Sequence, residues 1–102
     1  MEQRLKALVR FLLKQGATTI LFDQSDLYLF KDLNYYKIKS CKDDEELLSF
    51  CFSLAGLDSG KPESQSGNFF LEVDGVKRYL NLQGNLKERS AVLMLREMPC
   101  MS

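Results

Sequence analysis

The feature that most constrains the fold is the dipeptide Asp74–Gly75, which separates two strand-like runs rich in apolar residues. The runs are Asn68–Val73 and Val76–Leu82. Asp-Gly in this position favours a two-residue type I′ turn, and such a turn fixes the register of the two strands that it joins. We therefore predict an antiparallel hairpin in which Glu72 lies opposite Lys77 and Phe70 lies opposite Tyr79.

Further strands are predicted by short runs that are rich in aromatic and aliphatic residues and bounded by turn residues. They are Thr18–Phe22, Leu27–Phe30 and Tyr35–Lys39 in the first half and Ala91–Arg96 near the end. Polar clusters at 23–26 and 31–34 separate the first three. Because a parallel crossover needs about a dozen residues or more, connections this short predict antiparallel neighbours.

Residues 2–15 have the apolar spacing of an amphipathic helix, and Gly16 follows as a C-terminal stop. The expected stripe consists of Leu5, Leu8, Val9, Leu12 and Leu13. Such a stripe can also bind a membrane surface. However, the charges around it are mixed and its length suits packing on a sheet, so we expect it to face the core.

A second helix is predicted to begin near Asp43, because Asp43 and Glu46 have the spacing of a capping box. Its expected buried stripe consists of Leu47, Leu48, Cys51, Leu54 and Ala55. Gly56 would end the helix, and Asp58–Gly67, rich in Ser and Gly, is expected to be an exposed loop. The order α-β-β-β-α-β-β-β predicts a single α+β domain over residues 1–102, with helices packed on an antiparallel sheet.

The composition argues against several functional classes. Fourteen basic residues balance fourteen acidic ones, whereas nucleic-acid binding needs a basic surplus. Histidine is absent, so triads that use it are excluded. Three cysteines without a C-x-x-C pair, Cys41, Cys51 and Cys100, predict neither a disulfide framework nor a zinc site. We expect no nucleic-acid partner, no metal, no cofactor and no catalytic activity of the chain by itself, with Cys51 as a buried thiol.

The chain also lacks the usual membrane signals. No apolar run approaches the roughly 20 residues of a membrane span, and the N-terminus has a helical period instead of the continuous apolar stretch of a signal peptide. We therefore expect no direct membrane insertion and a cytoplasmic location.

Several segments match a known family pattern. Leu54–Asp58 reads L-A-G-L-D, Gln65–Gly67 reads Q-S-G, and the last predicted strand runs from Val92 to Arg96. With Ala17–Leu21 they resemble, over most of the chain, the N-terminal domain of the ATPases of type II secretion, type IV pili and competence. The Gram-positive competence members are the most similar. The family has A-S-D-I-H at the first strand, AGLD after the second helix, P-Q-x-G, L-R-x-S-T-L-P and a final V-x-x-R.

The resemblance implies a PAS-like fold that packs on a RecA-like motor domain within a hexameric ring. Two family arginines reach the phosphates of the motor-bound nucleotide, for which a guanidinium fork is suited. The final one falls on Arg96, while its partner position is the neutral Asn81. Leu21 replaces the family histidine, Ser64 replaces a proline, and 83–86 replaces S-T-L-P. Positions that build the fold are kept, and most nucleotide-contacting positions are lost.

We therefore expect a non-catalytic protein-interaction domain that docks on a motor domain, a neighbouring subunit or an assembly platform, with self-association as a further option. The expected contacts are Lys61, Gln65, Gly67, Phe70 and Tyr79, with Arg96 as the residual phosphate contact by resemblance. The alternative is a PAS-like sensor whose pocket would be lined by Phe50, Phe52, Phe69 and Phe70. A filled core is the competing expectation for those four side chains.

Overall fold

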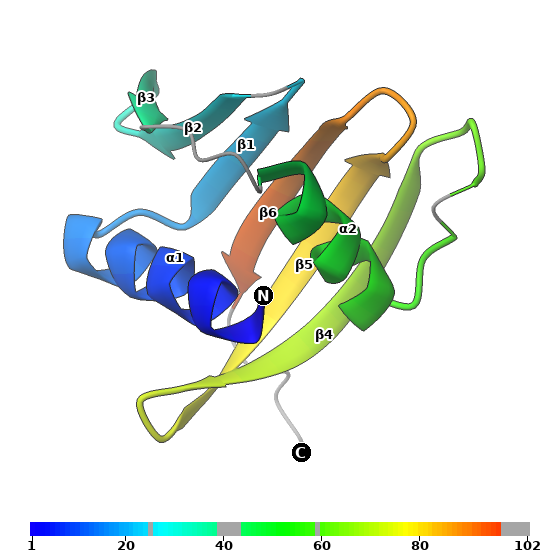
Figure 1. Ribbon diagram of the computed structural model, residues 1–102. Coiled ribbons are helices and arrows are strands. Elements are labelled where there is room, and N and C mark those ends of the chain that lie inside the picture. The colour runs from blue at the N-terminus through cyan, green and yellow to red at the C-terminus, as the bar shows by residue number, and fades with distance from the viewer. Residues whose placement is uncertain (25, 39–43, 59, 97–102) are drawn as a thin grey trace, which may run out of the picture.

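A computed structural model of the chain describes residues 1–24, 26–38, 44–58 and 60–96. The elements are α1 Glu2–Gln15, β1 Thr19–Asp23, β2 Asp26–Lys31, β3 Asn34–Ile38, α2 Asp44–Leu54, β4 Gln65–Val73, β5 Val76–Asn85 and β6 Ser90–Arg96 (Figure 1). This is the predicted α-β-β-β-α-β-β-β order, and the α+β fold class is confirmed. Asp43, the proposed helix cap, and Lys39, Cys41 and Cys100 lie outside the described residues.

All six strands form one antiparallel sheet in the order β3-β2-β1-β6-β5-β4. Each half of the chain contributes a three-stranded meander, and the two meanders meet where β1 pairs with β6. This central pair sets Ile20 opposite Leu93 and Phe22 opposite Ala91. The first and last strands of the domain therefore form its middle, and β3 and β4 are its edges.

Both helices lie on one face of the sheet (Figure 1). From α1, Leu5, Val9 and Leu12 are fully buried against alternate residues of the strands. Leu8 is partly buried, and Leu13, predicted to face the core, is 36% exposed. That prediction was wrong because the sheet contacts a narrower strip of α1 than the apolar spacing suggests.

Helix α2 buries Leu47, Leu48, Cys51 and Phe52 in the same core. Leu54, which we expected to be buried, is 39% exposed. Residues 47, 48, 51 and 52 share one helix face at the 3.6-residue period, whereas residue 54 lies at the margin, about 90° from the centre of that face. Gly56 adopts the left-handed conformation, with φ of 70°, immediately after α2.

The β4–β5 hairpin has the predicted register, with Glu72 opposite Lys77 and Phe70 opposite Tyr79. Asp74 and Gly75 both have positive φ, 53° and 79°, as a type I′ turn requires. The strands are longer than predicted, because Gln65–Gly67 pair with 82–84 and belong to β4. The segment taken as a loop up to Gly67 therefore ends at Ser64. Ser and Gly residues favour a loop prediction for this segment, but its backbone forms a strand because β5 supplies the hydrogen-bonding partners.

Candidate functional site

One sheet face carries no helix in the described part of the chain, and we call it the open face. Side chains alternate between the two faces of a strand, so the neighbours of the buried core residues point to the open face. Its apolar members are Leu21, Tyr28, Phe30, Tyr35, Phe70, Tyr79, Val92 and Met94. They extend across all six strands.

Aromatic pairs stand near both edges of the open face. On the β4–β5 side, the Phe70 and Tyr79 rings lie 4.9 Å apart at 40°, and the Lys77 ammonium lies 4.5 Å from the Phe70 ring centre. Such geometries are favourable for ring pairs and for a cation over a ring. Phe70 nevertheless remains 46% exposed. The predicted pairing of Phe70 with Tyr79 across the hairpin agrees with the structure.

The second pair was not predicted. Phe30 and Tyr35 lie opposite each other in β2 and β3, with their rings 4.9 Å apart at 50°. Tyr35 is 61% exposed. The signal was present in the sequence, because the short turn between these strands leaves few registers open, and the same argument used for Phe70 and Tyr79 would have found it.

Arg96 and Asn81 lie on neighbouring strands and point to the open face. Arg96 is exposed and lies opposite Tyr79, while Asn81 lies opposite Met94, two residues further along each strand. Asn81 is only 5% exposed. The structure therefore brings the two positions implied by the resemblance onto the same surface, but a cationic side chain occupies only one of them.

Asn81 is held inside its own hairpin. Its Nδ2 donates to the Gly67 carbonyl at 3.2 Å and to Asn68 Oδ1 at 2.8 Å, with a longer contact of 3.4 Å to Ser66 Oγ. The Oδ1 atom is buried and has no hydrogen-bond partner among the residues that the structure describes. The Asn81 amide nitrogen therefore ties β5 to β4. Burial of its oxygen without a hydrogen bond lowers the stability of the fold by about 1–3 kcal/mol.

Two of the predicted interaction residues have packing roles. Gln65 Oε1 accepts a hydrogen bond from the Asp58 N–H at 3.0 Å, and Gln65 Nε2 donates to the Asp58 carbonyl. Gly67 lies directly beneath the end of α2, where an added Cβ would come within 2.7 Å of the Ala55 carbonyl oxygen. Lys61 is exposed in the preceding loop. Gln65 and Gly67 therefore fix β4 to the end of α2, and Lys61 is not brought together with Phe70 and Tyr79.

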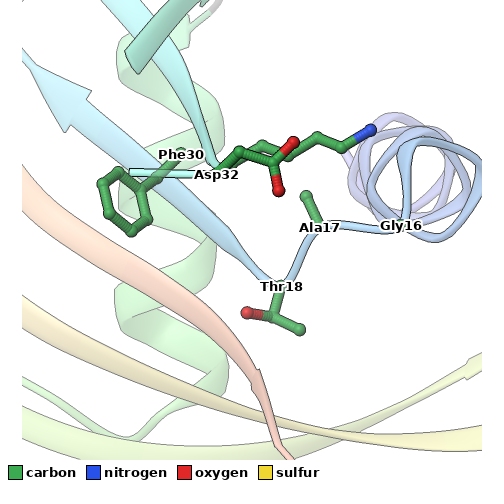
Figure 2. A pocket seen from close by; sticks show the side chains of 6 residues that line it. Gly16, Ala17, Thr18, Phe30 and Asp32 are labelled. Atoms are coloured by element: carbon green, nitrogen blue, oxygen red, sulfur yellow. The ribbon is translucent and has the colours of Figure 1, made fainter. Parts of the chain in front are cut away.

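Two hollows lie near the end of α1 and the β2–β3 turn. The first, about 180 Å³, is lined by Gly16, Ala17, Thr18, Phe30, Lys31 and Asp32, and Figure 2 shows Asp32 and Ala17 beside it. The second, about 300 Å³, is lined by Phe11, Gln15, Leu29, Lys31, Asp32 and Tyr36. Neither is lined by the phenylalanines proposed for a sensor pocket.

Those phenylalanines are not arranged around one space. Phe52 and Phe69 are buried in the core, and Phe50 packs against it. Phe70 points to the opposite face of the sheet from Phe69, because successive residues of a strand alternate. Phe50, Phe52 and Phe69, on the helix side of the sheet, therefore fill or border the core, which was the competing expectation to a sensor pocket.

Cys51 is fully buried in the core, as predicted. Burial raises the pKa of its thiol to about 12, because a thiolate would lose its hydration there. The thiol is therefore protonated at neutral pH and is not an activated nucleophile. Within residues 1–24, 26–38, 44–58 and 60–96, no group of three or more Cys, Asp or Glu side chains is arranged to hold a metal ion.

Within the same described residues, neither helix has the length and apolar character needed to cross a membrane. No protein-family model matches the chain, and no curated protein sequence matches it.

Proposed function

We propose that this chain is a non-catalytic protein-interaction domain that contacts its partner through the open face of the sheet. The observation that carries the proposal is the presence of two aromatic pairs, Phe70–Tyr79 and Phe30–Tyr35, each with one well-exposed ring, on the face opposite the helices. Aromatic side chains are enriched in protein interfaces, where they supply a large contact area at little cost in side-chain entropy.

The charges around the aromatic pairs favour a protein partner. Acidic Glu72 and Asp26 and basic Lys77, Lys37 and Arg96 share the same face through the strand registers. Lys37 forms an ion pair with Asp26 at 3.5 Å. An apolar centre with a rim of both signs is typical of a protein–protein interface, whereas a nucleic-acid surface is predominantly basic.

The resemblance to secretion, pilus and competence ATPases suggests the class of partner: a RecA-like motor domain, a neighbouring subunit or an assembly platform in the cytoplasm. Arg96 and Asn81 share the open face, and this supports a motor domain as the partner that binds the open face. Since Asn81 is uncharged and bonded within the hairpin, contact with a nucleotide in that complex would fall to Arg96. Docking would therefore depend on protein contacts.

Photo-crosslinking in cells tests the proposal. A photoreactive phenylalanine analogue replaces Met94, at the middle of the open face, and, as the matched control, Leu13 on the exposed side of α1. We expect a protein adduct from position 94 alone, and mass spectrometry should identify a motor ATPase of the secretion, pilus or competence class or one of its assembly proteins.

The purified partner then gives a second measurement. Met94→Glu should weaken its binding to the domain by about tenfold or more, because a buried apolar contact becomes an unpaired charge. Leu13→Glu should leave the binding constant unchanged. The absence of any adduct from position 94, or the same adducts from positions 94 and 13, would contradict the proposal.

A further inference from the structure

Strand β4 is an edge of the sheet, and half of its backbone hydrogen-bonding groups point away from the protein. Val73 and Val76 flank the two-residue turn and form a hydrogen-bonded pair. Such pairs alternate along an antiparallel ladder, so Leu71 and Phe69 also bond to β5. The N–H and C=O groups of Glu72, Phe70 and Asn68 must then point outward, beyond the last strand of the sheet.

This edge has few of the features that usually prevent strands from pairing between chains. Natural edges are short, carry Lys or Pro, or are covered. The opposite edge, β3, has five residues and contains Lys37. β4 has nine residues without Lys or Pro. Its one charged residue, Glu72, lies opposite Lys77 in β5, which balances the charge. Asp58 contacts Gln65 at the beginning of β4, whereas residues 68–72 lie further along the strand.

We propose that β4 pairs with β4 of a second copy of the chain, antiparallel and about a two-fold axis at Phe70. In this register Phe70 lies opposite Phe70 of the partner subunit, and Asn68 lies opposite Glu72 of the partner subunit. Each of these pairs exchanges two backbone hydrogen bonds, because all three residues present outward groups. The two sheets become one continuous sheet across the dimer, and the interface is isologous.

The side chains select this register over its neighbours. On the open face it places two half-exposed rings side by side, so the Phe70–Tyr79 pair continues into the pair of the other copy. On the helix face it places Phe69 opposite Leu71 of the partner subunit. An axis at Phe69 would set Phe70 against Asn68, and an axis at Glu72 would set two carboxylates against each other.

The inference concerns the edge of the sheet, and it goes beyond the proposed contact of the open face with a different protein. Either can fail alone, because Met94 lies on β6, which is two strands away from the edge strand β4 in each copy. Crosslinks from position 94 therefore report the open face, and the measurements below report the edge.

Sedimentation equilibrium of the full chain up to millimolar concentration should show a reversible monomer–dimer equilibrium. Phe70→Lys should weaken dimerisation by about tenfold or more, because it places two ammonium groups together at the axis. The matched control is Val76→Lys, which changes another exposed apolar residue of the same hairpin that does not lie on the edge strand. It should leave the dimerisation constant unchanged.

Disulfide trapping tests the register itself, in a chain with Cys41→Ser and Cys100→Ser. Phe70→Cys should form an intermolecular disulfide on mild oxidation, because the Cα atoms of a hydrogen-bonded pair lie about 5.5 Å apart. Tyr79→Cys is the control: it lies beside Phe70, but the two copies of position 79 would be separated by three strand spacings, roughly 14 Å. It should not cross-link.

A wild-type chain that stays monomeric at millimolar concentration would overturn the proposal. This holds even if β4 were found to pair with a strand of a different protein. So would equal dimerisation of wild type and Phe70→Lys, or equally fast disulfide formation by the Phe70→Cys and Tyr79→Cys chains. Circular dichroism establishes that each variant is folded. If Phe70→Lys fails to fold, the comparison of the two cysteine variants decides the question by itself.

Discussion

Replacement of Gly67 by alanine tests the contact between β4 and the end of α2. A Cβ at this position would lie 2.7 Å from the Ala55 carbonyl oxygen, 3.0 Å from Leu57 Cδ2 and 3.2 Å from Ala55 Cβ. The Leu57 side chain can turn away, but the Ala55 oxygen belongs to the backbone. The Gly56 N–H donates to Ser53 O and the Leu57 N–H donates to Phe52 O, so that oxygen moves only with the last turn of the helix.

The expected cost follows from this geometry. Inserting one methyl group into a packed region usually costs about 1–3 kcal/mol, and the backbone contact places Gly67→Ala in the middle of that range, at about 2 kcal/mol. Since about 1 kcal/mol shifts the melting temperature of a domain of this size by roughly 4–8 °C, Tm should fall by about 10 °C. Urea unfolding followed by circular dichroism measures the free energy, and the slope m should not change.

Gly60→Ala is the matched control, because among the described residues its Cβ would meet only a side-chain atom, Asp58 Oδ1 at 3.3 Å, and no backbone atom. It should change stability by less than about 0.5 kcal/mol, as exposed substitutions usually do. If Gly67→Ala costs no more than Gly60→Ala, the packing argument is refuted. The glycine would then be free to act in binding, as the sequence first suggested.

Three further predictions concern single side chains. Burial raises the pKa of the Cys51 thiol from its ordinary value of 9.0 to about 12. Between these values the thiol stays protonated in the folded state but ionises in the unfolded state. Stability should therefore fall by up to about 1.4 kcal/mol per pH unit between pH 9 and 12, and urea titrations of Cys51→Ala should lack this component. Asn81→Asp sets a carboxylate against the Gly67 carbonyl and Asn68 Oδ1 and should cost about 2–4 kcal/mol at pH 7, with much of the loss recovered at pH 4; equal loss at both pH values would contradict this. The Arg10–Asp74 ion pair, at 3.0 Å with both side chains exposed, should contribute under about 1 kcal/mol in a double-mutant cycle, and a larger coupling energy would show that it is shielded from solvent.

Local sequence patterns predicted the parts of the fold that depend on neighbours in the chain. Asp74–Gly75 predicted the hairpin and its register, so Glu72–Lys77 and Phe70–Tyr79 could be paired from the sequence alone. A two-residue turn leaves one register, and every later pair follows from it. The order of helices and strands followed in the same way from periodicity and breakers.

The candidate site was predicted only in part. Phe70, Tyr79 and Arg96 do share the open face, but Gln65 and Gly67 hold β4 to the loop and to α2. A polar residue and a glycine before a strand look the same in the sequence whether they bind a partner or pack inside the domain. The difference lies in Asp58 and Ala55, whose positions depend on how α2 ends.

The sequence by itself therefore determined the elements, the hairpin register and the absence of histidine chemistry. Only the tertiary structure decided that β1 and β6 join the two meanders, and which face of the sheet the helices leave open. In β1, Leu21 is as apolar as Ile20 and Phe22, yet it alone of the three points away from the core. Alternation separates the two faces of a strand, but when both carry apolar residues, the helices that pack on the sheet determine which face is buried.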